Sequence, residues 1–347
     1  MANKITAKDV ANPDMLNAIR NEASDAYRSM VPVATNANLA DVGNPILTYQ
    51  SVQNEFLNSL VNRIALTIVN RNMFENPLSF LKKGAMPLGI DTQEIYTNPA
   101  AGQTYESGTM NGILTPVNPD VKAAYYRRNR RDMYKVTIYN EQLTAAFVSW
   151  GNLEDLISSI VDSLYNGNTI GEFNLTKQLL GDAAQNKKIV QVVTPLPVDE
   201  ATSRTFSQKL RELSFGMSFP STDYNSYVLN GGGGNPVTTW TAKENIIIIL
   251  RKDVAAAVDV QLLAAAFNLS YADYVSRQIV VDNFNDADNM YAFIGDVGMF
   301  QIRENLRRMA EFYNSEKLAW SYWWHCWDTY ALSPFKNGVA LVTEAYV

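Results

Sequence analysis

The stretch from residue 75 to 135 constrains the fold more than any other part of the sequence, because prolines and glycines interrupt it throughout. No sustained helical period runs through it, and apolar and polar residues alternate only near 90–96 and 134–139. About 60 residues without a helix would be unusual inside a compact domain. The stretch therefore favours an extended two-stranded arm that reaches outside the globule. A small β subdomain packed on the main body is the alternative interpretation.

Residues 140–165 carry the strongest helical pattern of the chain, since apolar residues recur every three or four positions and polar residues occupy the other faces. The residues of this apolar stripe are Phe147, Trp150, Leu153, Ile157, Ile160 and Leu164. A single helix here would be about 39 Å long, against a radius of gyration of about 20 Å for a compact chain of this length. We therefore expect a structural spine that crosses most of the body, with a further helical segment at 170–184.

The rest of the chain mixes helical and strand-like segments. Further helices are predicted at 49–72, 206–217 and 254–267, and short strands at 189–193, 246–250, 279–281, 290–294 and 339–343. Residues 1–48 are mostly polar, with a short helix expected within 13–30 and an extended or loop segment at 34–42. They suggest a disordered tail or an arm that folds on a neighbour. The mixture predicts an α+β or mixed α/β protein.

Composition limits the class of protein. The chain has 347 residues, 47% of them hydrophobic, which suffices for a core in one or two lobes. Its 29 basic and 35 acidic residues give a net charge of −6, which exerts no general pull toward nucleic acid. The single cysteine, Cys326, cannot form an intramolecular disulfide and fits a reducing compartment. The first ten residues do not resemble a secretory signal, and no stretch approaches the roughly 20 apolar residues of a membrane span.

The sequence offers few convergent polar groups for catalysis or metal binding. His325 is the only histidine, so a multi-histidine metal site within one chain is excluded, and its tryptophan neighbours indicate a packed aromatic segment. The glycine run 231–234 is not followed by the residues of a phosphate-binding loop, and the acidic stretch 282–289 lacks the spacing of a calcium loop. We therefore predict no catalytic residue, no cofactor and no metal ligand.

A basic run at residues 127–131, preceded by two tyrosines, is the sharpest local charge feature. Arginines flanked by tyrosines could grip a phosphate backbone, or they could pair with carboxylates on a neighbouring subunit. The acidic net charge and the position beside the predicted arm favour subunit contacts. The candidate contact residues are Tyr105, Tyr125, Tyr126, Arg127, Arg128, Arg130 and Arg131.

Several blocks of sequence resemble the major capsid (head) protein of phi-29-like podoviruses, and they keep their order from about residue 12 to 343. They include Val31–Thr35, Val52–Phe56, Ser59–Ile64, Asn76–Leu78, Glu94–Thr97, Phe147–Asn152 and Leu263–Asn268, followed by the aromatic run around His325. The best-known member of that family has an additional immunoglobulin-like C-terminal domain. Because this sequence stops at Val347, we expect the contribution of that domain to be absent or supplied elsewhere.

The resemblance implies the Hong Kong 97-type capsid fold, an α+β fold with an N-terminal arm, an extended loop arm, a long spine helix, and peripheral and axial domains. Its parts would be the N-terminal arm at 1–48, a peripheral-domain helix at 49–74, the extended loop arm at 75–135, the peripheral domain with the spine helix at 136–221, the axial domain at 222–312, and a return to the peripheral domain at 313–347.

The same resemblance implies a structural protein that is not an enzyme. Copies would assemble in the host bacterial cytoplasm into hexamers and pentamers of an icosahedral or prolate phage head. Implied partners are a separate scaffolding protein, a portal or connector at one vertex, and packaged double-stranded DNA bound without sequence specificity, with no membrane. An encapsulin-like cellular compartment is the alternative of the same fold. A stand-alone enzyme or binding module is a further alternative, against which the lone histidine and the lack of nucleotide or metal motifs count.

Overall fold

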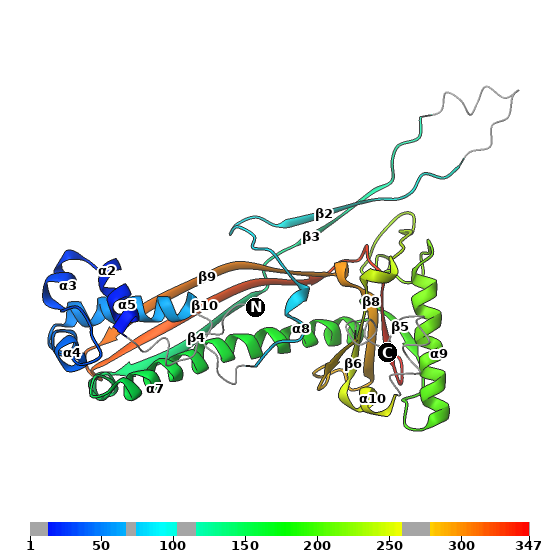
Figure 1. Ribbon diagram of the computed structural model, residues 1–347. Coiled ribbons are helices and arrows are strands. Elements are labelled where there is room, and N and C mark those ends of the chain that lie inside the picture. Colours follow the sequence, from blue (N-terminus) through cyan, green and yellow to red (C-terminus); the bar gives the residue numbers. More distant parts are fainter. Residues whose placement is uncertain (1–12, 67–73, 103–115, 259–277, 347) are drawn as a thin grey trace, which may run out of the picture. The chain divides into compact units, whose positions relative to one another are not determined.

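The computed structural model describes residues 13–66, 74–102, 116–258 and 278–346, and the chain divides into two compact units (Figure 1). Unit 1 consists of Met1–Asn76, Arg131–Glu172 and Leu306–Trp327. Unit 2 consists of Pro77–Arg130, Phe173–Asn305 and Asp328–Val347. Both helices and strands are present, which agrees with the predicted α+β class. No helix in the described ranges is long and apolar enough to cross a bilayer.

Unit 1 is held together by a helical core. Its helices are α2 (Pro13–Glu22), α3 (Asp25–Met30), α4 (Leu39–Thr48), α5 (Gln50–Leu66), α6 (Asn140–Ala146), α7 (Trp150–Val161), the π-helix η2 (Asp162–Asn166) and the start of α8 (Gly167–Gln185). The predicted helix at 49–72 is confirmed over α5, and its residues Phe56 and Leu60 are fully buried. The rings of Phe56 and Phe147 pack with their centroids 5.4 Å apart, which joins α5 to the segment after α6.

The prediction of a disordered tail or an arm on a neighbour is wrong for residues 13–48, which fold into the core of unit 1. Ile19 and Ile46 are completely buried there. The Glu55 side chain of α5 accepts hydrogen bonds from the backbone N–H of Ser24 at 2.5 Å and from its hydroxyl at 2.8 Å. The segment 34–42 is not extended throughout, because α4 begins at Leu39. Each helix buries only a few apolar residues, so the polar average of the segment concealed them.

The predicted single spine helix is wrong in its continuity, because the helical path breaks between α6 and α7. The hydroxyl of Ser149 accepts the N–H of Asn152 at 3.2 Å, in the manner of an N-cap that starts a new helix. The break does not disturb the apolar stripe, of which Phe147, Leu153, Ile160 and Leu164 are buried in the core of unit 1. Trp150 is half-buried and donates its indole N–H to the carbonyl of Asn36 at 3.3 Å. The side chain of Ile157 lies outside the described part.

A four-stranded sheet has the order β1-β9-β10-β4. Its strands are β1 (Lys82–Lys83), β9 (Phe300–Asn314), β10 (Ala319–Leu332) and β4 (Arg130–Tyr139). Neither β9 nor β10 was predicted as a strand. The aromatic segment around His325 is the middle of β10, where His325 itself is half-buried and Cys326 is buried.

Unit 2 is built on a five-stranded sheet of order β5-β11-β8-β6-β7. Its strands are β5 (Val190–Val193), β11 (Gly338–Val342), β8 (Met290–Asp296), β6 (Ile246–Arg251) and β7 (Gln278–Val281). All five were predicted within a few residues. One face packs with residues of α8 such as Leu180, and the other packs with residues of α9 (Glu200–Met217) such as Phe206 and Leu210. Since both faces are covered, the strands are continuous apolar runs.

Helix α9 starts earlier than the predicted 206, because the carboxylate of Asp199 caps it by accepting the N–H of Thr202 at 2.8 Å. The predicted helix at 254–267 is represented by α10 (Lys252–Ala257), and residues 259–277 lie outside the described part.

The predicted domain boundaries differ from the observed units. A boundary at residue 222 separates α9 from the sheet on which it packs, although the two share one core within unit 2. The segment 313–347, predicted to return as a whole to the peripheral domain, is divided: residues 313–327 lie in unit 1, and residues 328–347, with the final strand β11, lie in unit 2. Burial of a shared apolar surface, which spacing along the sequence does not reveal, decides both assignments.

Candidate functional site

The stretch with many prolines and glycines forms a two-stranded antiparallel ribbon of β2 (Thr92–Thr97) and β3 (Val121–Tyr126), as Figure 1 shows. We call these two strands the ribbon. The predicted bounds of 75–135 are too wide, because β1 at one end and residues 130–135 of β4 at the other belong to the four-stranded sheet. Residues 103–115, among them the candidate Tyr105, lie outside the described part.

The two faces of the ribbon differ in exposure. Residues alternate between exposed and half-buried along both strands, and the register pairs Gln93 with Tyr125, Ile95 with Ala123 and Thr97 with Val121 on one face. We call these six residues the outward face. Ile95 is 61% exposed, Val121 54% and Tyr125 63%. A contiguous apolar surface of this kind on a strand pair indicates a contact with another molecule.

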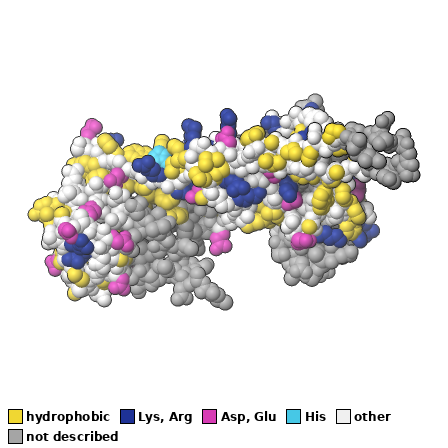
Figure 2. Space-filling view, turned by 90° about the horizontal axis from the view of Figure 1, so that it is seen from above, with side chains coloured by type: hydrophobic (Ala, Val, Ile, Leu, Met, Phe, Trp, Pro, Cys, Tyr) yellow, Lys and Arg dark blue, Asp and Glu magenta, His cyan; other side chains and the backbone are white. Residues whose placement is uncertain are grey.

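Exposed hydrophobic side chains also occur elsewhere on the protein. In Figure 2 they lie at the surface next to lysine and arginine side chains. The face in Figure 2 therefore presents apolar side chains together with basic and acidic ones, which suits association between proteins more than capture of a nucleic acid.

The two candidate tyrosines have different environments. Tyr126 is 7% exposed and donates its hydroxyl to the Glu94 carboxylate across the ribbon. Burial, together with that carboxylate, raises the pKa of Tyr126 far above its ordinary value. Tyr125 is exposed on the outward face and accepts a hydrogen bond of 3.1 Å from the side chain of Gln93. Only Tyr125 is thus placed to contact another molecule.

The four arginines also occupy distinct environments. The guanidinium of Arg130 binds the carboxylate of Asp328 at 2.7 Å, and both side chains are buried, with 3% and 0% exposure. Arg130 is therefore not a surface contact, and its prediction as one is wrong. Arg127 is exposed and binds Asp91 at 2.7 Å. Arg131 is exposed with its guanidinium 5.8 Å from the ring centre of Trp327, and Arg128 is half-buried.

Asn129, which was not among the predicted contact residues, joins the end of the ribbon to β10. Its side-chain amide donates to the carbonyl of Tyr330 at 2.8 Å and accepts the N–H of Tyr330 at 2.8 Å. The side chain thus pairs with β10 much as a strand backbone would. Four arginines, two on each side, drew attention away from this neutral residue, and no spacing signal could have identified it.

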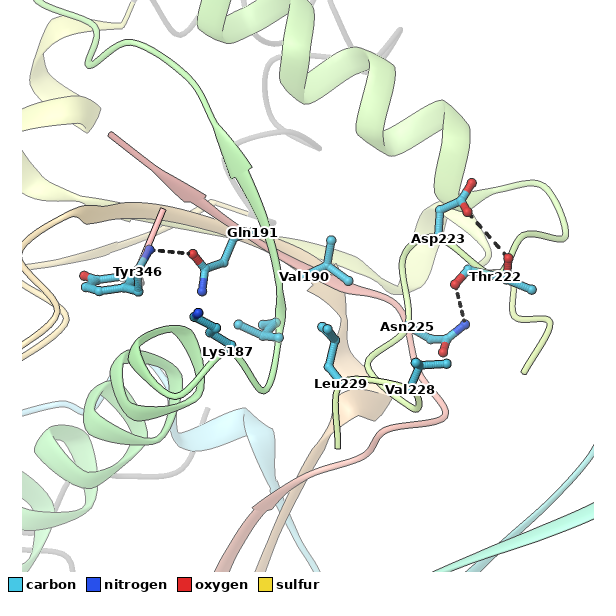
Figure 3. Close-up of a pocket in the computed structure, with 10 residues that line it drawn as sticks. Lys187, Val190, Gln191, Thr222, Asp223, Asn225, Val228, Leu229 and Tyr346 are labelled. Carbon is cyan, nitrogen blue, oxygen red and sulfur yellow. Dashed lines mark hydrogen bonds between the residues drawn. The ribbon is translucent and has the colours of Figure 1, made fainter. Parts of the chain in front are cut away.

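A cavity of about 510 Å³ in unit 2 lies between β5 and the loop 222–229. Figure 3 shows Gln191 hydrogen-bonded to the backbone N–H of Tyr346 on one side, and Asp223 beside Thr222 on the other. Its charged lining residues are Lys187 and Asp223. Its lining includes one carboxylate, that of Asp223, and no histidine or cysteine, so it does not form a metal-binding donor set. No group of three potential metal ligands occurs among the residues that the structure describes.

His325 and Cys326 lie next to each other on β10, where aromatic residues surround them. The ring of Tyr165 packs on that of Trp324 with centroids 5.8 Å apart. Burial raises the pKa of Tyr165 to about 12, with a further contribution from Cys326. This environment is that of a packed structural segment, as the aromatic run had suggested.

Sequence comparison identifies the family. The model of the phi29-like phage major capsid protein family matches residues 16–342. The major capsid protein of Bacillus phage PZA is 36% identical over 338 residues, which cover 95% of this chain and 72% of that protein. The major capsid protein of Streptococcus phage Cp-1 is 29% identical and covers 97% of this chain and 98% of its own length.

Comparison of structures gives the same fold. The capsid structure of Staphylococcus phage Andhra aligns with a TM-score of 0.63 and 16% identity, over 79% of this chain and 86% of that one. The capsid of a native GTA particle aligns with a TM-score of 0.53 and 12% identity, over 79% of this chain and 93% of that one. These likenesses confirm the predicted Hong Kong 97-type capsid fold. The chain belongs to the family of phi29-like phage major capsid proteins.

Proposed function

We propose that this phage major capsid protein, a component of the virion, joins its neighbours in the shell through the ribbon. The outward face of one copy would lie on the next copy within each hexamer and pentamer. The observation that carries this proposal is the exposure of Ile95, Val121 and Tyr125 on one side of a strand pair. Within one chain this apolar surface is unpartnered, and a neighbouring subunit would cover it.

The energetic argument depends on repetition. Burial of one large apolar side chain contributes about 1.5–3 kcal/mol, which is too little to hold two subunits together against the entropy of association. In a closed ring each copy both gives and receives a ribbon, so every contact after the first forms within one assembly. Effective concentration then makes the ring far more stable than a single pair.

The remaining arginines fit the rim of such a contact. Arg127 and Arg131 are exposed at the base of the ribbon, and Arg127 is already paired with Asp91 of its own chain. Salt bridges of this kind at a polar rim favour correct orientation and association rate more than affinity. We propose this role for Arg127 and Arg131, together with the aromatic contact of Tyr125.

Membership of the family also supports a set of specific assembly partners. We propose a separate scaffolding protein during assembly, a portal at one vertex, and double-stranded DNA inside the shell that is bound without sequence specificity. None of these roles requires catalysis, so we also propose that the chain is not an enzyme. Expression with the candidate scaffold and portal genes, followed by electron microscopy, would test these partners.

The ribbon contact is tested by Ile95→Asp, with Ile95→Val as the matched control. Because Ile95 is exposed in the single chain, Ile95→Asp should leave the melting temperature unchanged but abolish shells seen by electron microscopy. Ile95→Val keeps the face apolar and should assemble normally. Shells of ordinary yield and shape from Ile95→Asp would refute the proposal.

A further inference from the structure

Both strands of the ribbon are fastened together by side chains beyond their last paired residues. The backbone N–H of Asn98 donates to the carbonyl of Asp120 at 2.9 Å, and the Asn98 side chain donates to the Asp120 carboxylate at 2.6 Å. Lys122 binds the other oxygen of that carboxylate at 2.9 Å. These hydrogen bonds and the Lys122 charge lower the pKa of Asp120, so the carboxylate stays ionised.

The same side chains bind the loop that follows the glycine run. The Asn98 amide donates to the carbonyl of Pro236 at 3.0 Å and accepts the backbone N–H of Thr238 at 3.1 Å. The Tyr96 hydroxyl donates to the carbonyl of Thr238. The Asn98 side chain alone thus connects β2, the residue before β3 and the loop.

Lys122 and an aromatic stack complete the attachment. The ammonium of Lys122 donates to the carbonyl of Gly233 at 3.4 Å and lies 5.7 Å from the ring centre of Tyr227. The Tyr227 hydroxyl also donates to the carbonyl of Gly233, at 3.0 Å. Phe335 stacks between Tyr96, at 5.6 Å, and Tyr227, at 5.8 Å. Residues from four separate stretches of unit 2 therefore meet at the end of the ribbon where Thr97 pairs with Val121.

The glycine run provides the backbone shape that these contacts need. Gly231 and Gly234 have φ of +79° and +81°, a region that other residues rarely adopt. A Cβ atom at Gly232 would lie 2.5 Å from the ring of Tyr227, which is too close. A Cβ atom at Gly233 would meet nothing within 4 Å. Glycine is thus required at three positions of the run and is dispensable at Gly233.

We propose that residues 231–238 are a clasp that fixes the direction in which the ribbon leaves unit 2, and that Asn98 and Lys122 are its positioning residues. An isolated strand pair is only marginally stable in water and is free to twist. Holding the end of the ribbon beside Asn98 in advance reduces the entropy lost when the outward face docks on a neighbour. This inference rests on the proposed ribbon contact, because it assigns the clasp to preparing that contact.

The test compares Gly232→Val with Gly233→Ala, two changes in adjacent residues of one loop. Hydrogen exchange, measured by mass spectrometry on the unassembled chain, should become roughly 10-fold faster in β2 and β3 of Gly232→Val and of Asn98→Ala. Exchange in β6 and β8 should not change, which shows that unit 2 remains folded. Gly233→Ala should behave as the wild type. Lys122→Met replaces Gly232→Val in the comparison if the latter does not fold.

Assembly of the same variants supplies the second readout. Gly232→Val and Asn98→Ala should give a lower yield of closed shells and more irregular particles, whereas Gly233→Ala should give normal shells. The clasp would be overturned if hydrogen exchange in the ribbon were unchanged in both Gly232→Val and Asn98→Ala. It would also be overturned if exchange became faster but these variants still formed normal shells. Failure of the ribbon contact is recognised separately, because Ile95→Asp tests it without loosening the ribbon and should leave ribbon exchange unchanged.

Discussion

The five-stranded sheet of unit 2 and the ribbon share extended backbone geometry but bury their side chains in opposite ways. Every residue of β8 and β11 is buried, because helices cover both faces of the sheet. In the ribbon one residue in two is exposed, and the exposed face is apolar. The sheet thus completes its contacts within one chain, whereas the contact that we propose for the ribbon is with another copy. Exposure separates the two roles although both regions are rich in apolar residues.

Matched aspartate substitutions give the largest expected difference between the two regions. Ile294 of β8 is fully buried, so Ile294→Asp should lower the free energy of unfolding by more than about 4 kcal/mol and leave unit 2 unfolded. Ile95→Asp should change it by less than about 0.5 kcal/mol. Urea titrations followed by circular dichroism measure both. A similar loss in the two variants would mean that the ribbon face is part of the chain's own core.

The two ion pairs near the base of the ribbon should differ by a smaller amount. Arg130→Ala leaves the buried carboxylate of Asp328 without its cation and should cost about 3–5 kcal/mol. Arg127→Ala breaks a pair whose members are 82% and 42% exposed and should cost at most about 1 kcal/mol. Chemical unfolding of the two variants checks the order. Equal costs would show that burial does not distinguish the pairs.

The smallest expected effect is that of acid, which should weaken the attachment of the ribbon and leave the five-stranded sheet intact. The pKa of Asp120 is lowered in the folded chain from its ordinary 3.8, so its stabilisation is complete above that value and is lost as the pH falls through the lowered pKa. Ribbon protection against hydrogen exchange, corrected for intrinsic rates, should therefore differ between wild type and Asp120→Asn at neutral pH and converge in acid.

The comparison with Asp120→Asn removes the contribution of the other groups at the ribbon, because both proteins contain them. Protection in β6 and β8 serves as the internal reference. A constant difference between the two proteins across the pH range would contradict the assigned role of the Asp120 charge.

Prediction from sequence succeeded where one physical signal dominated. The strands of the five-stranded sheet are short apolar runs, and the ribbon strands alternate within a stretch that proline and glycine keep free of helices. Strand β9 was not predicted because only its first three residues are buried, and the charged residues that follow are interspersed with apolar ones in no regular alternation. In β10 aromatic residues occupy both faces, so no alternation appears.

Contacts between distant residues account for the remaining errors. In the sequence, nothing distinguishes Arg130 from the other arginines of the basic run. Its burial depends on Asp328, which lies 198 positions further along the chain. The break before α7 preserves the apolar stripe, so periodicity could not reveal it, although Ser149 carries a weak capping signal. The family resemblance supplied the fold and the function, which the residue patterns alone did not determine.

Asn129 has a consequence for the edge of β10 on the side of β4, at the point where β4 has not yet begun. The main chain leaves that edge for the ribbon just before β4 begins, and the Asn129 side chain occupies both the donor and the acceptor of Tyr330 that would otherwise face outward. An open strand edge is a template on which any other extended chain can add itself. At Tyr330 the Asn129 side chain takes the place of such an added strand, so this position of the edge is closed to another chain. One neutral amide thereby helps to restrict the subunit to ordered contacts.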